Sequence, residues 1–221
     1  MKYINQDELL NMTTRYRTQV VNSLSGFKSA NLIGTSNKEG IHNLAIFSSV
    51  VHLGASPALV GFITRPNTVV RHTLENIQQT KQFTINQVND GFWQAAHQTS
   101  ARYEAGECEF KQTGLTPLVI EGVGAPFVRE SRLKYALKLK EIVPIQLNDT
   151  LLVIGEITNI LCDKEAIKRD GYIDIESLNT VMISGLDSYH TSKRLSRLSY
   201  AKPGILQTKI SLDGEPEKNH S

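Results

Sequence analysis

The pattern of apolar and polar positions predicts a chain built mainly from short β-strands. Runs of apolar and β-branched residues bounded by turn residues are typical of strands. We expect strands at 28–35, 43–53, 58–63, 81–88, 118–120, 133–140 and 151–162. Segment 43–53 contains neither Pro nor Gly and is expected to be one largely buried strand. In 133–140 the period of two predicts a half-buried strand with a basic outer face, formed by Lys134, Ala136, Lys138 and Lys140.

One segment has a helical period instead. Val70, Leu74 and Ile77 are spaced i, i+4, i+7, which predicts an amphipathic helix over 68–80, with Asn67 or Thr68 as its N-cap. Residues 91–105 are expected to be helical or irregular.

The expected strands outnumber the helices, and no regular β-α-β alternation follows. This order favours a single, mainly β domain with a few helices, arranged as an antiparallel barrel. The domain is expected to span residues 1–221, with its core at about 16–200. The polar stretch 203–221 is either a loose tail or an arm that becomes ordered on a partner subunit.

Composition excludes several classes of protein. The chain is 40% hydrophobic and 21% charged, which excludes a mainly disordered protein. Its longest apolar runs are far below the roughly 20 residues that span a bilayer. With 24 basic and 22 acidic residues, its charge gives no reason to expect a nucleic-acid partner. Asp7 and Glu8 are unlike a secretory signal, and Cys108 and Cys162 form no CxxC, so we expect reduced thiols in a cytoplasmic protein.

Most catalytic and nucleotide motifs fail. Gly122-Val123-Gly124 is followed by Pro126, with no third glycine opening a helix, so it is not a dinucleotide fingerprint. The six histidines show no metal-ligand spacing, and no metal is expected. A Ser–His–Asp set stays open, since such residues are scattered in sequence.

Segment 64–73 suits an anion, because it leads from a strand into the first turn of a helix. Free backbone N–H groups at a helix start favour a phosphate, and arginine forks match its oxygens. Arg65 and Arg71 flank this point, and Thr68, His72 and Thr73 add donors. Upstream, Asn43, Ser48 and Ser49 supply an amide and two hydroxyls that suit a flat ligand with a phosphate tail. Alternatively, Arg71 and Glu75 form a solvated i, i+4 pair, and the serines cap a bulge.

The same segments resemble a known family. The sequence is similar to the flavin reductase-like proteins with an FMN-binding split barrel over roughly residues 16–200, in the stretches GFKSANLIGT (26–35), HNLAIFSSVVHLGASPALVGFITRP (42–66), VVRHTLENI (69–77), KQFTINQV (81–88) and LVIGEI (152–157). The resemblance implies a six-stranded antiparallel barrel of Greek-key type. It also implies a homodimer that holds FMN near the dimer interface.

The resemblance further implies roles for individual residues. The flavin ring would be lined by Asn43, Ala45, Phe47, Ser48, Ser49 and Val50, partly through backbone atoms. The phosphate would be held by Arg65, Arg71, His72 and Thr73, while Gln98, Thr99 and Ser100 would lie in a loop that closes over the flavin. Residues 185–190 resemble a C-terminal element of one subgroup, which implies an approach to the ring face across the dimer.

The activity implied is hydride transfer from NAD(P)H to flavin N5 and on to a small acceptor. No protein acid or base is obligatory for that step, so no catalytic residue is assigned, and His97 and His190 are candidates for the substrate side. Many relatives have Gly-Asp-His where this chain has Asn148-Asp149-Thr150, which weakens the case for plain NADH:flavin reduction. Three alternatives remain: an FMN electron-transfer or storage protein, a non-enzymatic barrel that binds another phosphorylated ligand, and, fitting less well, an oxidase of a pyridoxal-type phosphate.

Overall fold

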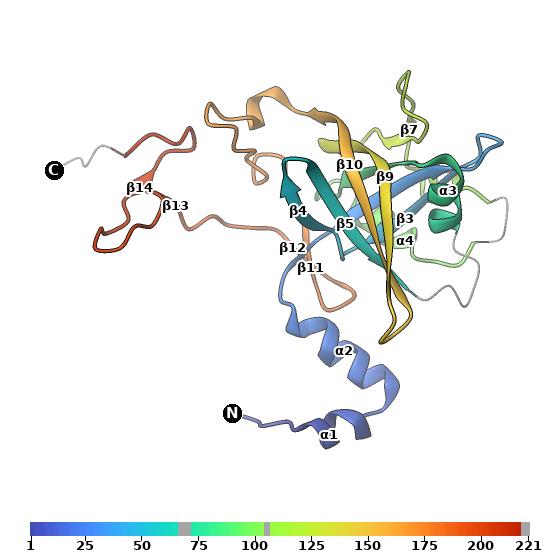
Figure 1. Cartoon of the computed structure of the whole chain (residues 1–221), viewed down its shortest axis with the longest axis horizontal. Coiled ribbons are helices and arrows are strands. Elements are labelled where there is room, and N and C mark those ends of the chain that lie inside the picture. The colour runs from blue at the N-terminus through green and yellow to red at the C-terminus, as the bar shows by residue number, and fades with distance from the viewer. Residues whose placement is uncertain (66–71, 104–106, 218–221) are drawn as a thin grey trace.

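The main sheet has seven antiparallel strands. The computed structural model describes residues 1–65, 72–103 and 107–217. Within them the strands lie in the order β3-β2-β6-β9-β10-β5-β4. Figure 1 labels five of these strands, β3, β4, β5, β9 and β10. Their bounds are β2 (Asn31–Ser36), β3 (His42–Phe47), β4 (Val51–Ala55), β5 (Ala58–Thr64), β6 (Gln82–Gln87), β9 (Leu133–Ile145) and β10 (Thr150–Cys162). The expected mainly β chain with a few helices is confirmed, whereas the Greek-key order stays a prediction.

Two of these strands correct an expectation from the sequence. Segment 43–53 is not one strand, because residues 48–50 separate β3 from β4. β3 pairs with β2 and β4 pairs with β5, at opposite edges of the sheet. Four residue steps from Phe47 to Val51 reach at most about 15 Å, whereas seven flat strands would span about 29 Å. The sheet must therefore curl until its two edges approach each other, which produces a barrel.

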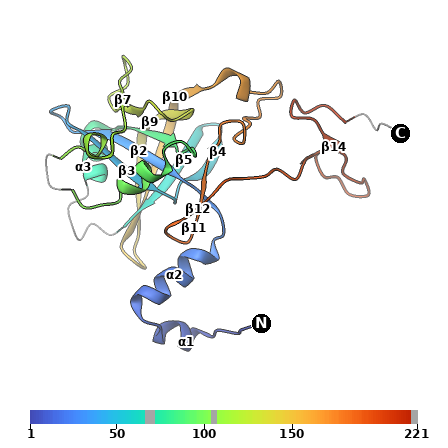
Figure 2. The ribbon, with the colours of Figure 1, turned by 180° about the vertical axis from the view of Figure 1, so that it is seen from behind.

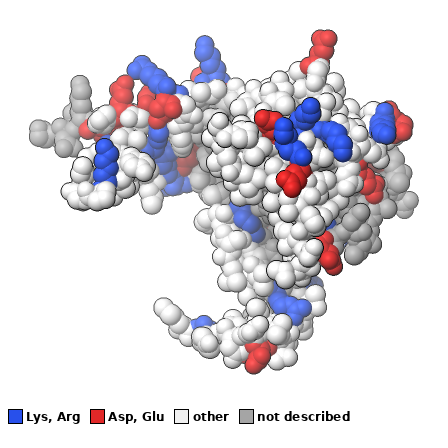
Figure 3. Space-filling view, in the orientation of Figure 1, with Lys and Arg blue, Asp and Glu red and all other residues white. Residues whose placement is uncertain are grey.

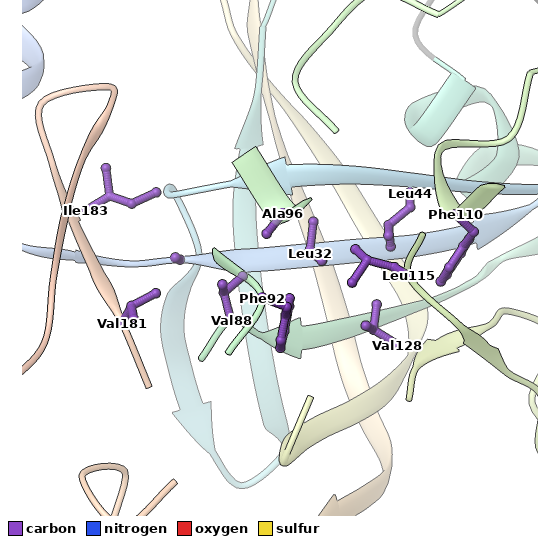
Figure 4. Close-up of a cluster of buried hydrophobic side chains, with 11 residues drawn as sticks. Leu32, Leu44, Val88, Phe92, Ala96, Phe110, Leu115, Val128, Val181 and Ile183 are labelled. Carbon is purple, nitrogen blue, oxygen red and sulfur yellow. The ribbon is translucent and has the colours of Figure 1, made fainter. Parts of the chain in front are cut away.

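The barrel interior is filled by one side of each strand. Ile33, Phe62, Phe83, Leu137 and Val153 are buried there and come from five different strands. Phe62 contacts Phe83 edge-to-face, with ring centroids 5.7 Å apart. Because side chains alternate along a strand, Leu32 on β2 points to the opposite face. It packs there in a second cluster, outside the barrel (Figure 4).

The remaining elements are short helices and small sheets outside the main sheet. The helices are α1 (Gln6–Asn11), α2 (Thr14–Leu24), α3 (His72–Thr80), α4 (Trp93–Gln98) and α5 (Glu109–Thr113), with a 3₁₀ turn at Lys164–Ala166. The expected helix at 68–80 is α3, and its expected start, with Asn67 and Thr68, lies outside the described residues. The minor strands are β1 (Lys28–Ser29), β7 (Pro117–Leu118), β8 (Phe127–Val128), β11 (Met182–Ser184), β12 (Ser188–His190), β13 (Arg197–Leu198) and β14 (Lys209–Ile210).

The outer face of β9 is only partly basic, which corrects another expectation. Lys134 is 7% exposed, and its ammonium donates to the carbonyl oxygens of Val128 and Arg129 at 2.9 and 3.1 Å. Burial lowers the pKa of this lysine. Lys138 and Lys140 are exposed as expected. The predicted alternation of side chains along β9 was correct, but residues 127–129 cover Lys134, the first of the three lysines on its outer face.

Both ends of the described chain extend away from the barrel (Figure 2). None of the residues of α1 and α2 is buried. At the other end, β13 and β14 form a small hairpin, here called the C-terminal arm (residues 194–217), which carries both acidic and basic side chains (Figure 3). The arm is fastened to its own chain, because Arg197 pairs with Asp170 at 2.6 Å and stacks on Tyr172 at 4.2 Å. These contacts hold the start of the arm, and the two alternatives for residues 203–221 stay predictions.

Gly34 leaves room for a close approach inside the fold. A Cβ built on it would overlap the carbonyl oxygen of Pro126 and lie 2.6 Å from Thr84 Oγ1. The Thr84 hydroxyl donates to that same carbonyl at 2.6 Å. Any side chain at Gly34 would therefore disturb the contact between β2, β6 and the 126–128 segment.

We predict that Gly34→Ala lowers the free energy of unfolding by about 1–3 kcal/mol, the usual effect of overpacking. Denaturant titration followed by circular dichroism measures this. Gly54→Ala is the matched control, since its added Cβ would meet only the Pro57 carbonyl oxygen, at 3.4 Å. Equal effects of the two substitutions would contradict the assignment.

Candidate functional site

The break between β3 and β4 places two serines side by side with different roles. The Ser49 hydroxyl donates to the Ile63 carbonyl at 2.9 Å and accepts from the Ile63 N–H at 3.1 Å, so it ties the break to β5. Ser48 is half-buried, and its hydroxyl has no partner among the described residues. Ser49 is thus committed to the fold, whereas Ser48 has an available donor and acceptor.

The start of α3 is fixed against β3 by buried polar side chains. The Asn43 amide donates to the Thr73 hydroxyl at 3.0 Å, and both residues are buried. One turn later, the Asn76 amide donates to the Thr35 hydroxyl at 3.1 Å. The structure therefore brings together Asn43 and Thr73, two of the residues expected at the site. Their bond sets the position of the α3 N-terminus beside the barrel.

Cationic residues lie near the same end of the barrel. Arg65 follows β5 directly and is exposed, with no side-chain partner among the described residues. His72 is the first residue of α3, and Arg71 lies outside the described residues. Through Ser49, the β3–β4 break is bonded to Ile63, two positions before Arg65. The available hydroxyl of Ser48 and an unpaired guanidinium therefore belong to neighbouring segments.

Three of the residues expected to line the flavin ring can be placed by their packing or by their side of the strand. The Phe47 ring meets Phe62 edge-to-face, with centroids 5.0 Å apart, and Val50 packs against the same inner cluster. Ala45 lies between Asn43 and Phe47 on the same side of β3, because side chains alternate along a strand. For Phe47 and Val50, contact with a flavin ring would therefore fall to backbone atoms. A lining role for these residues stays a prediction.

Sequence reasoning missed a buried carboxylate at this edge. Glu109 on α5 accepts a hydrogen bond from the Leu44 N–H at 2.9 Å, which satisfies a backbone donor of the edge strand β3. Burial raises the pKa of Glu109, and the nearby His72 opposes that shift. The only sequence signal was an acidic residue before an apolar one, which is common on any helix.

Helix α4 carries the expected flavin-covering residues at its C-terminal end. Its buried Ala96 packs with Leu32 and Leu44 in the outer cluster, so the helix lies against β2 and β3 (Figure 4). Thr99 is buried, and its hydroxyl donates to the Ala96 carbonyl at 2.8 Å. Gln98 and Ser100 are exposed, and the Gln98 amide donates to the Tyr103 hydroxyl at 3.2 Å. Thr99 thus ends the helix, leaving Gln98 and Ser100 to face solvent.

The two candidate histidines lie on neighbouring elements but differ in their contacts. His97 on α4 is exposed, and its Nδ1 lies 2.9 Å from the hydroxyl of Tyr189 on β12. His190 is half-buried, and its Nε2 lies 2.8 and 3.1 Å from the hydroxyls of Ser184 and Ser188. Sequence reasoning gave no role to Tyr189, which links α4 to the β11–β12 hairpin.

Comparison with known proteins identifies the family. The Flavin reductase like domain matches residues 24–176, more than half of the chain. The chain belongs to the flavin reductase-like family. A candidate flavin reductase with a split barrel domain from Shewanella frigidimarina NCIMB 400 is 51% identical, with a TM-score of 0.88 over 91% of this chain and 100% of that one.

Two further relatives of this flavin reductase-like protein are more distant. Flavoredoxin of Desulfovibrio vulgaris (Miyazaki F) is 23% identical, with a TM-score of 0.67 over 81% of this chain and 92% of that one, a likeness of fold alone. An uncharacterized protein of Aquifex aeolicus (strain VF5) is 29% identical over 56% of this chain and 63% of its own length. None of the described helices is long and apolar enough to cross a membrane.

We predict that substitution of Ser48 affects ligand binding, whereas substitution of Ser49 affects stability. Ser48→Ala should weaken FMN binding by about 0.5–1.5 kcal/mol, the net value of one hydrogen bond, and leave the unfolding midpoint unchanged. Ser49→Ala should lower the free energy of unfolding by about 1–3 kcal/mol, because it leaves the Ile63 N–H without its acceptor. Quenching of FMN fluorescence and thermal unfolding measure the two effects. The reverse assignment of effects would refute this division.

Proposed function

We propose that this protein binds FMN and acts as a flavin reductase-type oxidoreductase. A hydride passes from NAD(P)H to the flavin and then to a small acceptor. The observation that carries the proposal is the pair of available polar groups at the β3–β4 break and the end of β5, Ser48 and Arg65, in a chain of this family. Family membership alone supports a flavin; the donor set supports its phosphorylated form.

The residues present fit a phosphorylated flavin. A phosphate is recognised by guanidinium groups, hydroxyls and free backbone N–H groups. Arg65 and Ser48 supply the first two. The third is expected, on the sequence argument, from the segment that leads into α3, of which His72 and Thr73 are the first described residues. Arg71 is included as a further phosphate ligand on the sequence resemblance. In this arrangement Thr73 already bonds Asn43, so its contribution is to hold the helix start in place.

The bound flavin would supply the redox chemistry, accepting a hydride and donating electrons. Arg65 and Ser48 would hold the phosphate at the end of β5, and residues 45–50 would line the ring, partly through backbone atoms. Gln98 and Ser100, exposed at the end of α4, would limit the contact of the ring with water. No side chain is assigned a proton transfer. The role of the protein is to bind and orient its ligands.

A second candidate function is electron transfer or flavin storage without direct reaction with NAD(P)H. The fold shared with flavoredoxin supports it. So does the β9–β10 turn, where Asn148-Asp149-Thr150 stands in place of the Gly-Asp-His of many relatives, with Thr150 at the histidine position. There the Asn148 side chain accepts hydrogen bonds from the backbone N–H and the hydroxyl of Thr150. Binding of another phosphorylated ligand by a colourless barrel is a third candidate.

We also propose that the working form is a homodimer. Apolar side chains of the C-terminal arm are largely exposed, with Leu195 at 100% and Leu206 at 87%. On the edge strand β4, Val51 and Leu53 are also exposed. Large exposed apolar side chains of this kind can be covered by association with a partner. A second copy would cover these two surfaces.

We predict a yellow protein whose visible flavin absorbance is bleached by NADH or NADPH in the absence of air, because the reduced flavin loses that absorbance. Denaturation should release FMN, identified by mass spectrometry. A yellow protein that neither nucleotide bleaches, but that dithionite reduces, would favour the electron-transfer function. A colourless protein that also fails to bind added FMN would exclude both.

We predict that sedimentation equilibrium gives twice the chain mass of 24.6 kDa. Replacing both Leu195 and Leu206 with lysine should shift the equilibrium toward the monomer, because charges in a buried apolar contact are costly. Leu147→Lys is the matched control, since Leu147 is 98% exposed and lies in the β9–β10 turn, outside both the C-terminal arm and β4. A monomer at all concentrations would contradict the homodimer.

A further inference from the structure

Three aromatic side chains meet where α4 approaches the β11–β12 hairpin. Trp93 and His97 are spaced i, i+4 and therefore share one face of α4. Tyr189 contacts both: its ring centroid lies 5.1 Å from that of Trp93 and 5.6 Å from that of His97. The indole is 37% exposed and His97 is exposed, so this aromatic trio is half open to solvent.

A hydrogen bond joins the tyrosine to the histidine within the trio. Burial, with a smaller contribution from Asp187, raises the pKa of Tyr189 to about 12, so its hydroxyl keeps its proton at physiological pH. That hydroxyl lies 2.9 Å from His97 Nδ1 and has no other partner among the described residues, and the tautomer of His97 decides which of the two atoms donates. In the tautomer that accepts the tyrosine proton at Nδ1, the imidazole carries its own proton on Nε2. That tautomer presents an N–H donor at the outer nitrogen of His97.

The neighbouring histidine is bonded within its own hairpin. His190 uses its Nε2 in contacts with the hydroxyls of Ser184 and Ser188, inside its own hairpin. Its ring also packs edge-to-face on Phe27, with centroids 4.9 Å apart. By contrast, Nε2 of His97 has no partner within the described residues. Of the two substrate-side candidates, the contacts favour His97.

We infer that the aromatic trio of Trp93, His97 and Tyr189 is a binding surface, here called the recognition wall, for a planar conjugated ring that bears a carbonyl oxygen. In this surface Tyr189 is the positioning residue for His97. The ring packs on the aromatic side chains, and its oxygen accepts from His97 Nε2–H. The inference rests on the proposed function, for which such a ring is either the nicotinamide of the cosubstrate or the electron acceptor.

The chemistry of the trio selects this class of ligand. Aromatic faces and edges favour flat conjugated rings over flexible aliphatic chains. A single neutral N–H donor suits a carbonyl oxygen, whereas an anionic group would call for a cluster of cationic side chains. His97 also directly precedes Gln98, the exposed residue expected over the flavin. A ring held here lies next to the segment that covers the redox centre.

Trp93 makes binding at this wall directly observable, because it is the single tryptophan of the chain. We expect the indole N–H signal in a ¹⁵N-edited NMR spectrum to shift saturably when nicotinamide is added to the FMN-loaded protein. The probe 3-methylpyridine has the same ring without the carbonyl and should bind about 3- to 10-fold more weakly, the usual effect of losing one neutral hydrogen bond. Equal affinities for the two probes would overturn the role of the donor.

Variants test the positioning role of Tyr189. Tyr189→Phe keeps the ring packing but removes the hydroxyl, and should weaken nicotinamide binding about 3- to 10-fold. It should also convert the ¹⁵N signature of His97 from a single Nε2–H tautomer to a mixture. The double variant Tyr189→Phe, His97→Ala should bind no worse than His97→Ala alone, because the hydroxyl acts through the imidazole. His97→Gln has an amide donor at the end of its side chain and should recover part of the nicotinamide binding that His97→Ala loses.

Controls separate recognition from stability. Tyr3→Phe removes a hydroxyl from a tyrosine that is 83% exposed, far from the trio in sequence, and should change neither probe's binding. If Tyr189→Phe lowers the unfolding temperature but leaves the nicotinamide titration and the His97 tautomer unchanged, Tyr189 is merely structural and the inference is wrong.

Steady-state kinetics identify which ring the wall holds. If it holds the cosubstrate, Tyr189→Phe raises KM for NADH with kcat little changed; if it holds the acceptor, KM rises for menadione, a quinone, but not for ferricyanide, which has no ring. An unchanged KM for both NADH and menadione would overturn the inference. The proposed function fails separately, when the wild-type flavin is reduced by neither NADH nor NADPH, and the indole titration still reports on the wall in that case.

Discussion

The closure of the barrel at residues 48–50 is the constraint on which the other features depend. Only three residues join the two edge strands of a seven-stranded sheet, so the sheet has to curl. Ser49 completes the closure by bonding both backbone groups of Ile63. Without that side chain, the end of β5 would leave a backbone donor and acceptor unpaired where the β3–β4 break meets β5, here called the seam. The candidate site lies at this seam because the chain there cannot continue the regular ladder.

The barrel fills its interior with strand side chains and leaves the polar contacts to its rim. Phe47, Phe62 and Phe83 pack edge-to-face in the interior. At the rim, Asn43 bonds Thr73, and Glu109 satisfies the Leu44 N–H of the edge strand. These buried polar bonds hold α3 and α5 in fixed positions against β3. A ligand at the seam would thus meet a preorganised rim rather than a mobile loop.

Membership of the flavin reductase-like family indicates flavin chemistry at this rim. The helices and hairpins outside the barrel determine which other groups can approach it. Helix α4 and the β11–β12 hairpin come from distant parts of the chain, yet they meet through Tyr189. The C-terminal arm is anchored by Arg197 on Tyr172 and Asp170, which leaves its apolar residues facing outward. The barrel therefore supports two exposed surfaces, one aromatic and one aliphatic, with different proposed occupants.

The sequence by itself determined the mainly β class, strands such as 58–63, 81–88 and 151–162, and the family, because apolar periodicity and local motifs are properties of neighbouring residues. It did not determine that 43–53 is two strands, since an apolar run looks the same whether or not it crosses between sheet edges. It also could not show that Lys134 is covered or that Glu109 caps an edge strand. The partner of His97 is 92 positions away, and only the fold brings such residues within hydrogen-bond distance. Contacts of that kind arise from the packing of whole elements, which no local pattern records.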